Sequence, residues 1–172
     1  ITIYNNNKGT VTAPEINTYT GWTAKYWTTD TTADASQTVA NEGTVSNITA
    51  NATYYARYEK EITVSFDLNG GSGETPTPIK GKVQVNSNDV SKTKDPTITM
   101  PTVTTTKTGY TFDGWETSDG ANHYEDEGTG TFGANITLKA KWTINEYELT
   151  VNPNGGTYKN STSTTKEKQN YN

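Results

Sequence analysis

The chain has 172 residues, of which only 30% are hydrophobic, and it carries a net charge of −5 with a sequence pI near 4.9. This acidic composition lacks the basic face that nucleic-acid binding needs, and no run approaches the roughly 20 apolar residues that span a bilayer. The absence of cysteine excludes disulfides, thiolate metal sites and cysteine nucleophiles. The length allows one ordinary domain or two small ones, and the low hydrophobic share argues against a single large core. Because no signal segment opens the sequence, we expect a mature or excised segment of a longer protein.

The first 60 residues predict strands and one short helix or helical turn. Residues 33–43 place alanines and a valine at roughly helical spacing, and Gly43 is a suitable residue to end a helix. Residues 54–58 alternate two tyrosines and an alanine with Tyr55 and Arg57, which is the period of a strand with one buried face. Tyr55 and Arg57 are therefore expected to point toward solvent.

The middle of the chain predicts two strands separated by polar loops. Residues 62–66 alternate apolar and polar side chains, and an Asn-Gly-Gly turn at residues 69–71 then predicts the start of a hairpin. Residues 72–78 and 86–96 are polar and turn-rich, which predicts loops. The Gly-rich stretch 124–132 is expected to be irregular. Residues 136–142 again alternate, which predicts another strand.

The last 27 residues repeat the opening of the middle part. Tyr147, Leu149 and Val151 alternate with Glu148 and Thr150, and an Asn-Gly-Gly turn follows at residues 154–156. The pattern predicts a second strand and the start of a hairpin.

Four blocks of the sequence recur in the same order at nearly constant offset. The aligned pairs are residues 11–14 with 98–101, 21–29 with 109–117, 51–58 with 135–142 and 61–71 with 146–156, at shifts of 87, 88, 84 and 85. The blocks predict three segments: 1–60 as the later part of a repeat unit, 61–145 as a complete unit and 146–172 as the opening strand and hairpin of a further unit.

Three signatures of the central unit are similar to those of the Listeria–Bacteroides repeat, a family that includes the B repeats of internalin-type surface proteins. They are Val-Ser-Phe-Asp-Leu-Asn-Gly-Gly at residues 64–71, Gly-Tyr-Thr-Phe-Asp-Gly-Trp at 109–115 and Thr-Leu-Lys-Ala-Lys-Trp at 137–142. The first segment departs from the pattern, with Trp22 in place of tyrosine and Lys25-Tyr26 in place of Asp-Gly. The resemblance implies a mainly β fold of tandem small β-grasp-like repeats with hairpins and little helix, on the surface of a bacterial cell and without catalytic residues.

The recurring aromatic residues are interpreted as structural anchors rather than a binding site. Trp27 and Trp115 hold the same repeat position, and buried Trp is the commoner role for a recurring indole than sugar stacking. We expect both to be buried. The complete set of predicted anchors is Trp27, Trp115, Tyr58, Trp142, Gly70 and Gly155. The aromatic surplus of the first segment leaves a possible binding surface for host protein or glycan at Trp22, Tyr26 and Tyr55.

No residue pattern predicts catalysis, a cofactor or a metal site. The acidic residues between Asp113 and Glu127 fail the EF-hand spacing, because a loop glycine at Gly120 would put Trp115 at the first ligand position. His123 is the only histidine and has no recurring serine or acid partner. No recurring Lys–Glu–Asn set indicates an isopeptide crosslink.

The sequence therefore predicts a non-enzymatic, extracellular repeat region that acts as a stalk or spacer presenting distal domains, attached to the cell wall through other regions. The alternative is an adhesive module that uses exposed aromatics or edge strands. The expected partners are neighbouring repeats, and host protein or glycan for the alternative. Because an incomplete sheet exposes an unpaired edge, residues 146–172 are also expected to complement the incomplete residues 1–60, within one chain or head-to-tail between chains. The alternative for this tail is local pairing.

Overall fold

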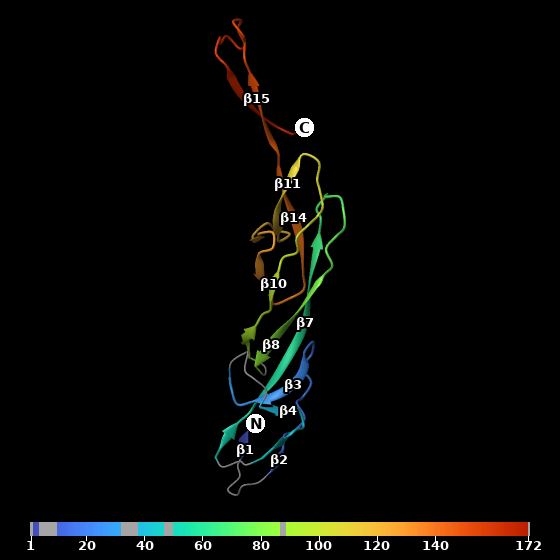
Figure 1. The fold of residues 1–172 in the computed structure, drawn as a ribbon. Coiled ribbons are helices and arrows are strands. Elements are labelled where there is room, and N and C mark those ends of the chain that lie inside the picture. The colour runs from blue at the N-terminus through green and yellow to red at the C-terminus, as the bar shows by residue number, and fades with distance from the viewer. Residues whose placement is uncertain (1, 4–9, 32–37, 47–49, 87–88, 172) are drawn as a thin grey trace. The chain divides into compact units, whose positions relative to one another are not determined.

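The computed structural model describes residues 2–3, 10–31, 38–46, 50–86 and 89–171. These residues form β-strands in several sheets, and none of them lies in a helix (Figure 1). The predicted mainly β class is confirmed, whereas the β-grasp-like arrangement of the repeats and their boundaries stay predictions. The chain divides into two compact units. Unit 1 comprises Ile1–Val64, Pro78–Ile98 and Gly130–Ile136, and unit 2 comprises Ser65–Thr77, Thr99–Thr129 and Thr137–Asn172.

Unit 1 is organised around the first ten residues of the long strand β7 (Tyr55–Asp67). On one edge, β7 pairs antiparallel with β3 (Thr23–Thr28), which in turn pairs with β4 (Val39–Ala40). On the other edge it pairs antiparallel with β8 (Ile79–Asn86), which continues into β9 (Asp89–Lys94). Two short pairs also belong to the unit: β1 (Thr2–Ile3) with β6 (Ala52–Thr53), and β2 (Val11–Thr12) with β5 (Thr44–Val45).

The helix expected over residues 33–43 is wrong in its described part. Val39 and Ala40 form β4, and Val39 lies opposite Trp27 of β3 with its side chain buried. A β-branched side chain beside a neighbouring strand favours the extended backbone, and this packing overrides a weak helical spacing of alanines. Gly43 closes the turn to β5, and its amide donates to the carbonyl of Ala40 at 2.9 Å. Ala33 and Ala35 lie outside the described residues.

The loop expected over residues 86–96 is also wrong in part, because Asn86 belongs to β8 and residues 89–94 form β9, which pairs antiparallel with β8. The sequence of β8 is Ile-Lys-Gly-Lys-Val-Gln-Val-Asn, in which lysines and a glycine hide the alternation. Val83 is nevertheless almost fully buried, and Gly81 sits so close to Pro96 that a Cβ there would approach the proline ring to 2.6 Å.

Unit 2 holds a sheet in the order β12 (His123–Tyr124), β11 (Tyr110–Glu116), β14 (Ile136–Ile144) and the end of β7. The register of β11 on β14 shifts between Phe112 and Trp115, which marks a β-bulge. The stretch 124–132, expected to be irregular, contains Tyr124 of β12 and all of β13 (Thr129–Thr131). Strand β13 forms a separate two-stranded sheet with β10 (Thr97–Thr99), and most of both strands belongs to unit 1.

The chain of unit 2 ends in a hairpin of β15 (Glu146–Val151) and β16 (Thr165–Asn170), drawn in red in Figure 1. The two strands are antiparallel, with Glu146 opposite Asn170 and Val151 opposite Thr165. The predicted strand and hairpin are confirmed. In this structure, β15 has the local partner that was named as the alternative to complementation.

The alternation expected along β7 is confirmed over its second half, where Ile62, Val64 and Phe66 are buried. It fails at Arg57, which was expected in water but is 2% exposed. Arg57 lies opposite Tyr26 of β3 and Asn86 of β8, so β7 has a paired strand on each edge at this position. The following turn behaves as predicted, because Asn69 and Gly70 have φ angles of 50° and 83°.

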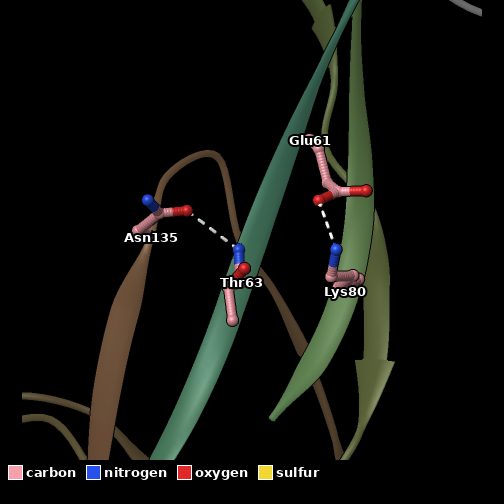
Figure 2. A network of polar contacts seen from close by, with 4 residues as sticks. All are labelled: Glu61, Thr63, Lys80 and Asn135. Atoms are coloured by element: carbon pink, nitrogen blue, oxygen red, sulfur yellow. Dashed lines mark hydrogen bonds and ion pairs between the residues drawn. The ribbon is translucent and has the colours of Figure 1, made fainter.

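Two polar contacts flank β7 near its middle (Figure 2). On one side, the backbone amide of Thr63 donates to the side-chain oxygen of Asn135 at 2.8 Å. On the other, Lys80 of β8 forms an ion pair with Glu61 at 2.8 Å. The first contact ties β7 to a residue 72 positions away, immediately before β14.

Candidate binding cavity in the first unit

The two tryptophans at equivalent repeat positions are buried, as predicted. Trp115 is 0% exposed and Trp27 is 8% exposed. The indole nitrogen of Trp115 donates to the carbonyl oxygen of Pro101 at 3.2 Å, and that of Trp27 donates to the carbonyl oxygen of Pro14 at 3.0 Å. Each indole therefore buries its ring and satisfies its only polar group on the segment that precedes its strand.

The next pair of predicted anchors, Tyr58 and Trp142, is held differently in the two repeats. Trp142 is half-buried and donates from its indole nitrogen to the carbonyl oxygen of Leu68 at 2.9 Å. Tyr58 is buried and donates from its hydroxyl to the carbonyl oxygen of Asn17 at 2.9 Å. Burial raises the pKa of the Tyr58 phenol, so this hydroxyl keeps its proton and its hydrogen bond well above neutral pH. Gly70 and Gly155, the last anchors, are exposed turn residues with positive φ.

Unit 1 contains a cavity of about 530 Å³ beside Trp27. One wall is the loop of residues 14–19, and the other is the strand segment 54–58 of the same unit. The lining therefore includes five aromatic side chains, namely Tyr19, Trp27, Tyr54, Tyr55 and Tyr58. A cavity of this volume lies in the range that small-molecule sites occupy.

The three residues of the predicted binding surface do not line one cavity, and their role in binding stays a prediction. Tyr55 is half-buried and lines the cavity, whereas Trp22 and Tyr26 are half-buried and lie outside its lining. Trp22 stacks on Tyr19 with ring centroids 6.3 Å apart, and the ammonium of Lys60 lies 5.0 Å from the Trp22 ring. Tyr26 lines a much smaller cleft. The sequence reasoning missed Tyr19 and the loop beside it, although the Tyr-Thr-Gly-Trp run at residues 19–22 was a usable signal.

A carboxylate with two lysine partners lies on the sheet of unit 1. Glu59 contacts Lys25 of β3 at 3.2 Å and Lys82 of β8 at 3.1 Å. Burial alone would raise the pKa of Glu59, but the hydrogen bonds from Lys82 and Lys25 outweigh it, and the pKa is lowered. This cluster links three neighbouring strands across one face of the sheet.

The central repeat carries a related ion pair, in which the acidic residue lies on β11 and the lysine lies on β14. Asp113 contacts Lys141 at 2.9 Å and accepts a hydrogen bond from Thr143 at 3.3 Å. The hydrogen bond from Lys141 is the main reason that the pKa of Asp113 lies below its usual value. In the repeat alignment, Lys25 takes the place of Asp113, so the departure from Asp-Gly in the first segment is matched by the acidic Glu59 on the partner strand.

The family model of the Listeria-Bacteroides repeat domain matches residues 63–141. Residues 63–141 are a Listeria–Bacteroides repeat domain. The matched range runs from β7 to β14 and contains the Trp115–Pro101 contact, the bulge before Trp115 and the Asn69–Gly70 turn.

Two proteins of Evansella cellulosilytica are similar to this chain. One, whose name contains the words "membrane protein", is 36% identical over 115 residues, which is 66% of this chain and 15% of the relative. The other, whose name contains the words "Gly-rich membrane protein", is 36% identical over 112 residues, which is 64% of this chain and 11% of the relative. The chain thus spans a small part of both relatives, and neither name describes an enzyme. No solved structure matches the chain. Among the described residues, no helix is long and apolar enough to cross a membrane.

The acidic stretch of the Listeria–Bacteroides repeat domain forms turns. Asp119 accepts hydrogen bonds from the Thr117 hydroxyl at 2.6 Å and the Ala121 amide at 3.1 Å. The hydrogen bond from Thr117 is the main reason that the pKa of Asp119 is lowered. His123 of β12 lies 3.3 Å from Glu125, which belongs to the turn after that strand. Within the part of the chain that the structure describes, no three His, Asp or Glu side chains are grouped to hold a metal ion.

Proposed function

We propose that this chain is a non-enzymatic, extracellular spacer of a bacterial surface protein, which presents distal domains away from the cell. The observation that carries the proposal is that the end of one repeat and the start of the next lie in the same strand, β7. Residues 51–58 align with the closing block of the repeat domain, and residues 61–71 align with the opening block of the next repeat. Strand β7, Tyr55–Asp67, contains the last four residues of the first block and the first seven of the second, with no break between them.

A similar passage follows the central repeat. β14 ends at Ile144 and β15 begins at Glu146, so a single residue separates the closing strand from the next opening strand. That residue, Asn145, donates from its amide to the carbonyl of Gly109 and accepts at its own carbonyl from the amide of Tyr171. Repeats joined without flexible linkers suit a spacer, because reach then grows with each added unit and is not lost to chain entropy.

A second candidate function, adhesion, is favoured by the aromatic cavity of unit 1. Aromatic side chains supply stacking faces for sugar rings or apolar groups, and Tyr55 and Tyr19 stand at the cavity with part of their surface accessible. In this alternative, the ligand is a host glycan or protein segment that enters between the loop 14–19 and the strand segment 54–58.

Surface display separates the two functions. An epitope tag is placed beyond one, two or three copies of the chain on a wall-anchored carrier in a Gram-positive host, and antibody binding to whole cells is measured. A spacer predicts that tag access rises with copy number and that Tyr55→Ala changes nothing. An adhesive module predicts that the purified chain binds a glycan array or host cells and that Tyr55→Ala removes this binding. Tag access independent of copy number would exclude the spacer.

A further inference from the structure

The segment that contains β8 and β9 carries a charge opposite in sign to that of the chain as a whole. Residues 79–94 include four lysines and one aspartate, which is a net charge of +3, whereas the whole chain carries −5. The rest of the chain therefore carries −8, the difference between these two values. The acidic average of the sequence thus conceals one basic segment.

Strand pairing in unit 1 brings the lysines of this segment to one face of the sheet. Lys82 lies opposite Glu61 of β7. Gln84, two residues further along β8, lies between Glu59 of β7 and Lys94 of β9. Directly opposed residues share one face of a sheet, and so do alternate residues of one strand. These lysines and glutamates therefore point to the same side of unit 1.

Ion pairs add two more lysines to this face. Glu59 contacts Lys25 of β3 at 3.2 Å and Lys82 at 3.1 Å, and Glu61 contacts Lys80 at 2.8 Å (Figure 2). Lys80 and Lys82 are more than half exposed, and Lys94 is exposed as well. We define the lysine face by four residues: Lys25, Lys80, Lys82 and Lys94. It brings four ammonium groups to the two carboxylates Glu59 and Glu61.

The hairpin of β15 and β16 shows that exposed lysines elsewhere are balanced one to one. Lys166 pairs with Glu148 at 2.7 Å, and Lys168 pairs with Glu146 at 3.2 Å. These two lysines have the same spacing along their strand as the two of β8, and they are also more than half exposed. An excess of positive charge, rather than the presence of lysine, therefore distinguishes the lysine face.

Neutral hydrogen-bonding side chains stand among the charges of the lysine face. Thr23 of β3 lies opposite Glu59, and Thr63 of β7 lies opposite Lys80. Thr23 is exposed, while Thr63 and Gln84 are half-buried. Hydroxyl and amide groups both donate and accept hydrogen bonds, as the hydroxyls of a sugar do.

We propose that the lysine face binds an acidic polysaccharide. Alternate residues of a strand are about 7 Å apart and neighbouring strands about 5 Å apart, so the ammonium groups form a spaced array. A sugar polymer likewise separates its acidic groups by hydroxyl-bearing ring atoms, which can meet the threonines and Gln84. Its acidic groups then contact the lysines, and its hydroxyls lie over Glu59 and Glu61.

The same spacing disfavours nucleic acid as the partner. Duplex DNA carries one negative charge per about 1.7 Å of axis, so its phosphates would also lie over Glu59 and Glu61. The remaining acidic surface of the chain repels any polyanion, which restricts the contact to the lysine face. The proposal goes beyond the spacer function and does not depend on it, and it uses a surface other than the aromatic cavity.

Binding of the full 172-residue chain to immobilised alginate, which has a carboxylate on every sugar, provides the first test. The expected result is binding that weakens about tenfold or more as NaCl is raised from about 50 to about 300 mM, because salt screens exposed charges. Uncharged dextran should not bind. The absence of alginate binding at low salt, or equally tight binding of single-stranded DNA, overturns the proposal.

A pair of double variants locates the contact. Lys80→Gln with Lys82→Gln should weaken alginate binding about tenfold, because each lysine near an anionic surface contributes to affinity. Lys166→Gln with Lys168→Gln is the matched control, since it removes the same charge at the same spacing from β16 and should leave binding unchanged. Circular dichroism verifies that both variants stay folded. Equal losses in the two variants contradict the assignment to the lysine face.

Lysine acetylation followed by mass spectrometry tests the same contact in the unsubstituted chain, where folding is not disturbed. Bound alginate should slow the acetylation of Lys80, Lys82 and Lys94 several-fold and leave the rates at Lys166 and Lys168 unchanged. Equal protection of both sets, or protection of neither, shows that the lysine face is not the binding surface.

Discussion

The indole nitrogen of Trp115 donates a hydrogen bond to the carbonyl oxygen of Pro101, and the same bond joins Trp27 to Pro14 in the preceding repeat. Pro14 lies 13 residues before Trp27, and Pro101 lies 14 residues before Trp115. The same contact therefore occurs in the first segment and in the repeat domain of residues 63–141, while the assignment of the first segment to a repeat stays a prediction. The contact also explains how a strand of mostly polar residues is fixed to the loop before it.

Truncation of Trp115 should be among the most damaging substitutions in the chain. Trp115→Ala is expected to cost about 3–5 kcal/mol, because it removes a fully buried indole and leaves a cavity against Phe66 and Phe112. Trp115→Phe should cost less, since it keeps an aromatic ring but leaves the Pro101 carbonyl without its donor. Urea denaturation followed by circular dichroism measures both. Tyr147→Ala on the exposed face is the control, and a similar loss there would refute the assignment of Trp115 as the core residue.

Gly114 is predicted to tolerate no side chain. Its φ is +89°, and a Cβ there would lie far inside contact distance of the carbonyl oxygen of Tyr124. Gly114→Ala should therefore cost more than about 2 kcal/mol and disturb the pairing of β12 on β11, where Trp115 lies opposite Tyr124.

Gly120 is the control for Gly114. It has a similar φ of +71°, but a Cβ there would meet nothing within 4 Å. Gly120→Ala should show only the cost of a left-handed backbone, about 1 kcal/mol. Thermal melting of the two variants separates crowding from backbone strain, and equal losses would show that the close approach of Tyr124 is unimportant.

The contribution of Glu59 to stability should depend on pH. The pKa of its carboxyl is lowered from the ordinary value of 4.5, so the charged form is favoured by folding. The stabilisation is then complete above that value and is lost as the pH falls through the folded pKa. Glu59→Gln should lower the free energy of unfolding near neutral pH by about 1 kcal/mol or less and have little effect in acid. Glu61→Gln removes an ion pair whose side chains are both more than half exposed, so it should lower the free energy of unfolding near neutral pH by less than Glu59→Gln does. An effect of Glu59→Gln that is constant with pH would contradict this assignment.

Much of the fold could be predicted from local sequence patterns, namely the alternation of apolar and polar residues and the Asn-Gly turns. Period-two alternation located the second half of β7, most of β14 and β15, because each of these strands presents one apolar set to one face. The Asn-Gly turns also followed from sequence, since few residues adopt the φ angles of Asn69 and Gly70 without strain.

The remaining features depend on contacts between residues distant in sequence. Strand β8 contains Gly81 between two lysines, and only its pairing along β7 makes it a strand. Arg57 is buried at a position where β7 has a paired strand on each edge, and no local pattern reveals that pairing. The cavity in unit 1 could not be predicted either, because it arises where the loop 14–19 meets residues 54–58, about 40 positions later.

The contacts on the two sides of β7 in Figure 2 should differ in importance. Asn135→Ala removes the acceptor for the Thr63 amide, and the expected loss is about 1 kcal/mol with faster hydrogen exchange at that amide. Asn135→Asp retains an oxygen acceptor in the same place and should preserve the slow exchange. Lys80→Ala removes an ion pair whose side chains are both more than half exposed, so the loss should stay below about 0.5 kcal/mol. The physical reason is that Asn135 joins segments that are 72 residues apart in sequence. At the exposed ion pair, water takes the place of the Lys80 ammonium group at little cost in free energy. Exchange rates at Thr63 that are the same in Asn135→Ala and in the unsubstituted chain would show that the side-chain bond does not secure this edge of β7.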